Sequence, residues 1–259
     1  MPELPEIEAA AAQLRAALRG GTIASVEVAH PAFARRLPAK AAGALAGRAV
    51  DGVDRRGKHQ IIRFTGGGVV LVHFRLNGEW EIGRAGDAAP RFARVAITLT
   101  NGTRVSLVDS RALSTLEFAA TAESKLPRMG PEATDAAFTP DALGAAVARK
   151  KGAIKPALLD QRVVAGLGNI YAAEALWLAQ ISPLAPAGKL GAARRTKLVK
   201  AIRDVLRRAP SGRYWMSDRV TNWRVYDREG DRCRRCGGRI RRVAQAGRST
   251  FYCPSCQRR

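Results

Sequence analysis

The sequence predicts an α+β protein of several domains, because segments of different character follow one another along the chain. One helix-like segment is followed by strand-like segments up to about residue 118, and a helical region comes next. The four cysteines all come after it, close to the end of the 259-residue chain. We expect domains at 1–122, 139–225 and 226–259, with a linker at 123–138.

The first domain is predicted to begin with a helix over residues 4–19. Apolar residues recur there at helical spacing, and two glycines end the pattern: Ile7, Ala11, Leu14, Leu18, Gly20 and Gly21. Strands follow, with an apolar run at 69–74 and a hairpin pattern at 95–108 around Asn101-Gly102. One helix followed by many short strands favours a sandwich or barrel with the helix laid against it.

The middle of the chain is predicted to be helical. A polar, proline-containing stretch at 123–134 reads as a linker. Thr139-Pro140-Asp141 is typical of a helix start, with a capping hydroxyl, a proline in the first turn and an acid near the positive helix end. A second amphipathic helix is expected over 192–208.

The charge of the chain favours a polyanionic partner. Lys and Arg total 44 against 22 acidic residues, which gives a net charge of +22. An Arg-rich composition could reflect a GC-rich genome, but that bias would raise the acidic residues nearly as much as the basic ones. Nucleic acid is therefore the expected partner. No apolar run reaches the ~20 residues that span a bilayer, and the start is not a signal peptide, so we expect a cytoplasmic protein without a membrane partner.

The cysteines have the spacing of a zinc site. They form two C-x-x-C pairs, Cys233 with Cys236 and Cys253 with Cys256. Four thiolates close the tetrahedral shell of one Zn²⁺ and leave no position for a water, so the predicted zinc is structural. Disulfides or redox pairs are the alternative. Residues 239–252 between the pairs read as an arginine-bearing hairpin, which suits phosphate contacts.

The first residues place an amine beside a carboxylate. Once the initiator Met is removed, Pro2 becomes a free secondary amine next to Glu3. An α-amino group titrates near pH ~8, well below lysine, so part of it is neutral and nucleophilic at physiological pH.

Six motifs together resemble the formamidopyrimidine-DNA glycosylase and endonuclease VIII family, and they cover essentially the whole chain. They are MPELPEIE, RRGKHQIIRF (55–64), MGPEAT (129–134), IKPALLDQRVVAGLGNIYAAEALW (154–177), RVYDREGDRC (224–233) and the cysteine pairs. The resemblance implies an N-terminal β-sandwich with a leading helix, a helix-two-turns-helix domain and a zinc finger hairpin. It also implies a base-excision repair enzyme that removes oxidised bases and then cuts the abasic strand.

The resemblance assigns catalytic roles at the start of the chain. Pro2 would attack C1′ of the damaged nucleotide, and the resulting iminium would promote loss of the 3′ phosphate by elimination. Glu3 would be the acid/base partner and Glu6 a second acid. Without the resemblance, both glutamates would be ordinary acids at a helix N-terminus.

Further residues match the family's DNA contacts. Lys58 would approach the lesion and a flanking phosphate and lower the pKa of the Pro2 amine, although an exposed turn lysine would look the same. Lys155 and Asn169 lie in the helical block, and Arg248 lies on the zinc hairpin; all three are expected to bind DNA, Asn169 and Arg248 at phosphates.

The chain departs from the family at the side chains that fill the space left by an extruded base. The family uses a Met three residues after a strand-end His, with an Arg and a Phe from a later loop. Here His73 is followed by Leu76, and Arg111 by Leu113. Leucine fills space but stacks less well than an aromatic ring. These leucines could instead be ordinary strand-edge residues.

The lesion class is open at this point. Members specialised for oxidised purines carry a longer loop where this chain has residues 211–230, which contain Tyr214, Trp215 and Trp223. These aromatics could stack on a base or pack against the zinc module. We expect oxidised purines, 8-oxoguanine and formamidopyrimidines, with oxidised pyrimidines as the alternative.

Two alternatives of another class stay open. One is a non-catalytic binder of damaged or abasic DNA, and the other is a general zinc-ribbon protein, which leaves Pro2 and Glu3 unexplained. We expect a monomeric bacterial protein that binds damaged double-stranded DNA and is associated with the nucleoid, with one structural Zn²⁺.

Overall fold

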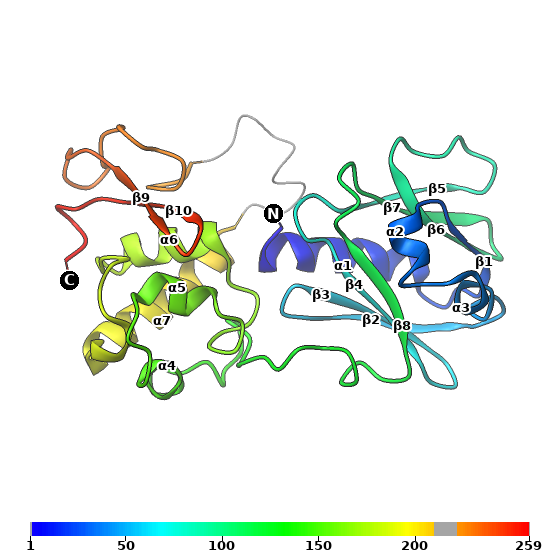
Figure 1. The fold of residues 1–259 in the computed structure, drawn as a ribbon, viewed down its shortest axis with the longest axis horizontal. Coiled ribbons are helices and arrows are strands. Elements are labelled where there is room, and N and C mark those ends of the chain that lie inside the picture. The colour runs from blue at the N-terminus through cyan, green and yellow to red at the C-terminus, as the bar shows by residue number, and fades with distance from the viewer. Residues whose placement is uncertain (1, 210–221, 259) are drawn as a thin grey trace. The chain divides into compact units, whose positions relative to one another are not determined.

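The computed structural model describes residues 2–209 and 222–258. These residues form two compact units that divide between Pro127 and Arg128 (Figure 1). Among the described residues, no helix combines the length and the apolar character needed to cross a membrane.

The first unit begins with helix α1 (Leu4–Leu18), which confirms the helix predicted at 4–19. Glu3 is its N-cap residue, and the Glu6 carboxylate accepts the backbone N–H of Glu3 at 2.8 Å. The predicted apolar stripe is buried, with Leu14 and Leu18 fully enclosed. The helix therefore starts directly after Pro2 and is held by the core along its length.

Two four-stranded antiparallel sheets follow α1, in the orders β1-β6-β7-β5 and β2-β3-β4-β8. The strands are β1 (Ile23–Val28), β2 (Val50–Arg56), β3 (His59–Phe64), β4 (Val69–His73), β5 (Glu79–Arg84), β6 (Ala93–Leu99), β7 (Thr103–Val108) and β8 (Thr115–Ala119). Short helices α2 (Pro31–Ala34) and α3 (Ala39–Gly43) lie between β1 and β2. The predicted hairpin at 95–108 is β6–β7, and the apolar run at 69–74 is β4.

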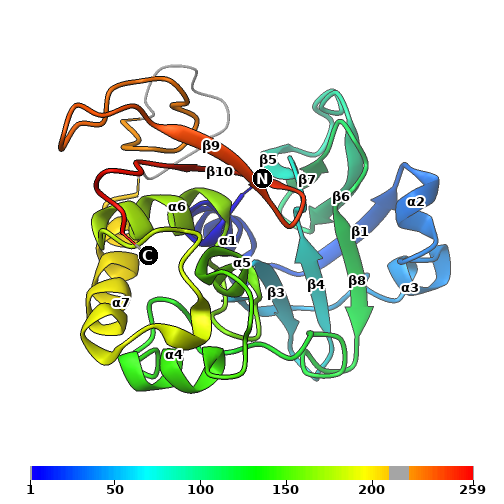
Figure 2. The same cartoon turned by 60° about the vertical axis from the view of Figure 1, so that its left-hand side comes forward.

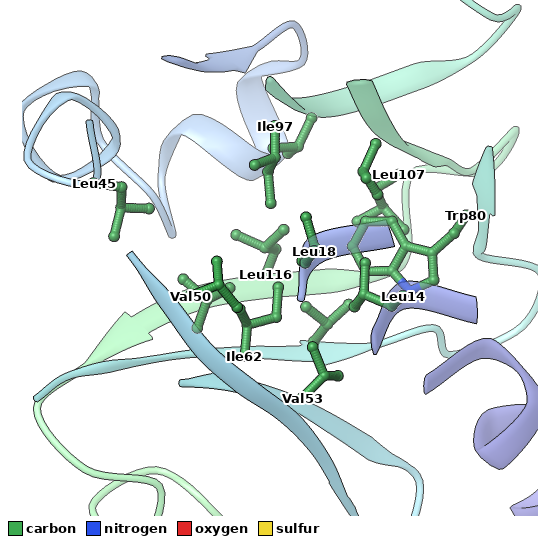
Figure 3. Packing of buried hydrophobic residues seen from close by; sticks show 14 of the residues in the cluster. Leu14, Leu18, Leu45, Val50, Val53, Ile62, Trp80, Ile97, Leu107 and Leu116 are labelled. Atoms are coloured by element: carbon green, nitrogen blue, oxygen red, sulfur yellow. The ribbon is translucent and has the colours of Figure 1, made fainter. Parts of the chain in front are cut away.

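The core of the first unit lies between the two sheets and α1. Figure 3 shows Leu14 and Leu18 of α1 meeting Val53 and Ile62 from one sheet and Leu107 from the other. Every strand can bury one face because its inward residues find partners on the opposite sheet or on the helix. The expected sandwich with a leading helix is therefore confirmed.

The second unit is helical and ends in a small hairpin. Its elements are α4 (Pro140–Val147), α5 (Ile154–Leu159), α6 (Asn169–Leu178), the 3₁₀ turn η1 (Ala187–Lys189), α7 (Ala192–Arg207), β9 (Arg241–Gln245) and β10 (Arg248–Tyr252). Thr139 caps α4 as predicted, because its hydroxyl accepts the N–H of Ala142 at 3.0 Å. The helix expected at 192–208 is α7. Helix α6 is almost completely buried, and the hairpin packs beside it (Figure 2).

The predicted hairpin at 239–252 is confirmed by β9 and β10. Ala246 and Gly247, at its turn, have φ of 48° and 71°. Two successive positive φ values are what a two-residue hairpin turn needs, because they match the twist of the strands. The four-part domain division stays a prediction, since compactness separates the described residues only once.

Candidate active site and nucleic-acid interface

The start of the chain is buried. Pro2, Glu3 and Glu6 are all enclosed, although two of them are acids. Their position at the beginning of α1 stabilises negative charge, because the unpaired N–H groups of a helix N-terminus carry partial positive charge. Two carboxyl groups thus lie in the first turn of the helix that follows Pro2.

Lys58 lies in the turn that joins β2 to β3. Arg56 pairs with His59 across this hairpin, and Gly57 has a φ of 57° that closes the turn. Lys58 is buried, which contrasts with an ordinary exposed turn lysine. Arg55, at the end of β2, donates to Glu8 of α1 at 2.7 Å. This ion pair links the turn that carries Lys58 to the first helix.

His73 pairs with a second histidine that the sequence did not single out. The rings of His59 and His73 lie 4.7 Å apart in an edge-to-face arrangement. Burial lowers the pKa of His59 to about 4, assisted by the positive charge of Arg75. Burial, followed by His59, Arg75 and Lys58, lowers the pKa of His73 to about 3. Both imidazoles are therefore neutral at physiological pH.

A buried aspartate holds the loop that carries Arg111 and Leu113. The Asp109 carboxylate accepts the backbone N–H groups of Arg111, Leu113 and Ser114 at 3.0, 2.8 and 2.7 Å. Asp109 was not predicted from the sequence, although an aspartate two residues before a turn position is a recognised signal for such a loop. The loop is fixed through its backbone, which leaves the side chains of Arg111 and Leu113 outside.

The turn that carries Leu76 is attached to the same loop. The Ser114 hydroxyl lies 2.9 Å from the carbonyl oxygen of Phe74, and the N–H of Gly78 closes the turn on that carbonyl. His73 accepts the N–H of Arg75 on its Nδ1 at 2.9 Å. The structure therefore brings Leu76 and Leu113 onto two connected loops, where both side chains are exposed.

In the second unit, Lys155 and Asn169 meet at the start of β10. The Lys155 ammonium donates to Asn169 Oδ1 at 2.5 Å, to Thr250 Oγ1 at 2.7 Å and to the Ser249 carbonyl at 3.2 Å. The Asn169 amide donates to the same Ser249 carbonyl at 3.1 Å. Arg248 begins β10 and is exposed, so these contacts fix the strand from which it projects.

The expectation that Lys155 contacts DNA directly does not fit this geometry. Its side chain is 1% exposed, and its ammonium is directed at three protein oxygen atoms. Asn169 is the first residue of α6 and follows Gly168, the N-cap, as the glycine-rich turn predicted. Lys155 instead joins α5, α6 and the zinc hairpin.

The four cysteines form one cluster. Their sulfur atoms all lie within 4.8 Å of one another, and the Cys233–Cys256 and Cys236–Cys253 pairs are 3.8 and 3.5 Å apart. A tetrahedral Zn²⁺ with bonds of about 2.3 Å needs sulfur separations of about 3.8 Å, so the cluster fits the ion. Burial, with crowding by neighbouring sulfur atoms, raises the pKa of Cys256 to about 12. A dication in the cluster would stabilise the thiolate form of Cys256, which this raised pKa disfavours.

Trp177 of α6 supports this cluster from the helical side. Its indole N–H donates to the sulfur of Cys233 at 3.4 Å. The guanidinium of Arg235 lies over the ring at 3.9 Å from its centroid and donates to the Trp177 carbonyl at 3.0 Å. Hydrogen bonds to metal-bound thiolates hold the ligands in place, so Trp177 belongs to the zinc site.

Glu174 is a further residue that the sequence analysis missed. Its carboxylate is fully buried in α6 and accepts the backbone N–H groups of Arg224, Val225 and Tyr226. The available signal was a single acid inside an otherwise apolar helical segment. Glu174 thereby fixes the segment that leads into the zinc module.

The aromatic residues at 211–230 are described only in part. Trp223 packs edge-to-face on Tyr171 of α6, with ring centroids 5.6 Å apart. Trp223 is half-buried and contacts helix α6, so this contact matches neither a base nor the zinc module. Tyr214 and Trp215 lie outside the described residues.

Family models match three parts of the chain. Residues 1–116 match the formamidopyrimidine-DNA glycosylase N-terminal domain, residues 129–215 the H2TH domain of the same glycosylase, and residues 230–259 the zinc finger found in FPG and IleRS. The chain belongs to the formamidopyrimidine-DNA glycosylase family. It is a DNA glycosylase of base-excision repair with one structural zinc site.

Curated relatives and solved structures of this family span the full chain. The formamidopyrimidine-DNA glycosylases of Jannaschia sp. (strain CCS1) and Azorhizobium caulinodans are 38% and 39% identical, each over 100% of both chains. A Lactococcus lactis FPG mutant in complex with Fapy-dG-containing DNA has a TM-score of 0.90 at 28% identity. MutM in complex with carbocyclic 8-oxo-G-containing DNA has a TM-score of 0.89 at 30% identity, and each chain is covered completely in both comparisons.

Proposed function

We propose that this glycosylase removes oxidised purines from double-stranded DNA and then cleaves the abasic strand by β-elimination, with Pro2 as the nucleophile. The observation that carries the proposal is a buried proline at position two, with buried glutamates at positions 3 and 6 at the start of α1. The purine preference is supported by the DNA in similar structures, which contains Fapy-dG in one and carbocyclic 8-oxo-G in another.

In the proposed reaction, the neutral Pro2 amine attacks C1′ of the damaged nucleotide. The N–C1′ bond forms as the bond to the base breaks, and the base leaves with the electron pair and takes up a proton. The sugar ring opens to an iminium, which draws electrons from C2′. Loss of the C2′ proton forms a double bond to C3′ and expels the 3′ phosphate, and water then frees Pro2.

Glu3 and Glu6 have different roles in this proposal. Glu3 adjoins the nucleophile and donates a proton to the sugar ring oxygen as the ring opens. Glu6 accepts the backbone N–H of Glu3 and is a positioning residue that fixes the first turn of α1. Lys58 contacts a phosphate beside the lesion and favours the neutral form of the Pro2 amine through its own charge.

Each unit has its own proposed DNA contacts. Arg248 and the N-terminus of α6 at Asn169 bind phosphates, and Lys155 positions them from behind. In the first unit Leu76, Arg111 and Leu113 fill the space left by the extruded base, while neutral His73 holds the turn that carries Leu76. The protein acts in the bacterial cytoplasm, where DNA binding brings it to the nucleoid.

Borohydride reduction tests the nucleophile. An abasic duplex should give one covalent adduct with the mature protein, and a variant with two residues added before Pro2 should give none while it still binds a tetrahydrofuran duplex. An adduct with the extended protein would show that another amine is the nucleophile. A mature protein that binds but cannot be trapped would instead favour the non-catalytic binder.

Activity on oxidised pyrimidines is the second candidate function, and the short interval at 211–230 favours it. The two are separated by the release of 8-oxoguanine and of an oxidised pyrimidine from otherwise identical duplexes. Faster release of the purine supports the leading proposal, and faster release of the pyrimidine replaces it.

A further inference from the structure

One exposed aromatic side chain has no role in the function proposed above. Among the described residues, the exposed large hydrophobic side chains are Leu76 (38%), Ile82 (41%), Phe92 (40%) and Leu113 (43%). Leu76 and Leu113 belong to the proposed DNA contacts, and Ile82 lies within strand β5. Phe92 remains, and single exposed apolar residues are common on protein surfaces, so its surroundings decide whether it has a role.

Phe92 is hydrogen-bonded to the loop that carries Leu113. Its carbonyl accepts the backbone N–H of Asp109 at 3.1 Å. Its near neighbour Arg94 donates to the carbonyl of Asp109 at 2.6 Å and to that of Ser110 at 3.2 Å. Phe92 therefore joins the same group of connected loops as Leu76 and Leu113, which we call the loop cluster (residues 74–78, 90–94 and 109–114).

The backbone of the loop cluster is strained at one residue in each loop. Arg75, Phe92 and Ala112 have φ values of 56°, 65° and 52°. Phe92 is the third residue of a turn that the N–H of Ala93 closes on Pro90 at 3.0 Å. This position normally takes glycine or asparagine, because a side chain at positive φ costs free energy. Strained residues of this kind concentrate at functional sites.

The surroundings of Phe92 fit DNA. The guanidinium carbons of Arg91 and Arg94 lie 4.6 and 5.5 Å from the centre of its ring. An exposed aromatic ring among arginines is the combination that binds a nucleobase by stacking and the adjacent backbone by charge. A protein partner would explain the exposed ring but not its arginine flanks, and the chain carries a net charge of +22.

We propose that Phe92 stacks on an unpaired base of the bound DNA, as a third apolar contact of the loop cluster beside Leu76 and Leu113. This inference rests on the proposed function, because it needs the loop cluster to face the duplex where a base has been extruded. The two leucines fill space but stack weakly, so Phe92 supplies the aromatic surface that neither of them has.

The test compares Phe92→Ala, Phe92→Leu and Phe92→Trp with Ile82→Ala, which removes an equally exposed apolar side chain elsewhere on the unit. Each variant binds a duplex with a tetrahydrofuran site opposite 2-aminopurine. Phe92→Ala should bind about ten-fold more weakly and lose the change in 2-aminopurine fluorescence, because stacking on an aromatic side chain contributes that much per base. Phe92→Trp and Ile82→Ala should behave like the wild type, and Phe92→Leu should be intermediate.

Equal affinity and equal fluorescence for Phe92→Ala and wild type would overturn the inference. If Phe92→Ala does not fold, Phe92→Leu is compared with Phe92→Trp instead. Equal affinity and equal 2-aminopurine fluorescence of these two variants would also overturn the inference. Borohydride trapping of the wild type on an abasic duplex is run in parallel. If the wild type is trapped while Phe92→Ala binds and fluoresces like the wild type, this inference alone is refuted. If the wild type shows no preference for the abasic duplex, the proposed function is refuted and the inference with it.

Discussion

Replacement of Lys155 by methionine should destabilise the second unit and displace its proposed phosphate contacts. Methionine keeps the length of the side chain but removes the ammonium and its three hydrogen bonds, at 2.5, 2.7 and 3.2 Å. Hydrogen bonds to a charged group stabilise by ~1.5–3 kcal/mol each, and relief of the desolvation cost of a buried cation offsets much of that sum. We expect a net loss of about 2 kcal/mol in the free energy of unfolding.

The salt dependence of DNA binding separates this positioning role from a direct phosphate contact. A residue that neutralises one phosphate contributes about 0.9 to the slope of log Kd against log salt. The matched control is Arg248→Met, which should lower the slope by about that amount and leave the free energy of unfolding unchanged. Lys155→Met should instead weaken binding together with a loss of stability in urea unfolding. If Lys155→Met keeps wild-type stability and lowers the slope by about 0.9, Lys155 contacts a phosphate directly and its positioning role is refuted.

Three further predictions concern buried groups. The folded-state pKa values of His59 and His73 lie near 4 and 3, so the unfolded chain binds more protons below pH ~6.5, and the free energy of unfolding should fall by roughly 1–2 kcal/mol per histidine between pH 7 and 5. In urea titrations at the two pH values, His59→Phe should remove about half of that fall. An unchanged fall would contradict the prediction. Glu174→Gln should speed hydrogen exchange at the three amides that the carboxylate holds; unchanged exchange would show that other contacts hold the segment. Trp177→Phe loses the hydrogen-bond donor to Cys233 and should weaken zinc binding about ten-fold in competition with a chromophoric chelator. Equal zinc affinity of the variant and the wild type would show that the indole does not contribute to the zinc site.

The elements predicted from the sequence are those whose signals are local. Helix α1, the β6–β7 hairpin and the cap of α4 each follow from residues a few positions apart, and the cysteine spacing encodes the zinc cluster directly. Neighbouring residues determine these features, and the tertiary structure then preserves them.

The features that could not be predicted depend on residues far apart in the chain. Lys155 meets Thr250 across 95 positions, and Glu174 holds amides about 50 positions away. Neither pairing leaves a local pattern, so Lys155 looked like a surface contact and Glu174 like a helix residue. Phe92 differs again, because its turn is local, whereas its hydrogen bond to Asp109 forms only once β6 and the loop after β7 have come together.

The way in which Asp109 holds its loop has a consequence for protein engineering. At positions 111 and 113 its carboxylate accepts only main-chain N–H groups, so these two hydrogen bonds do not depend on which side chains stand there. The side chains at positions 111 and 113 can thus be exchanged while the backbone hydrogen bonds of the loop are kept. New residues can be introduced at both positions, which we propose contact DNA, without redesign of the scaffold beneath.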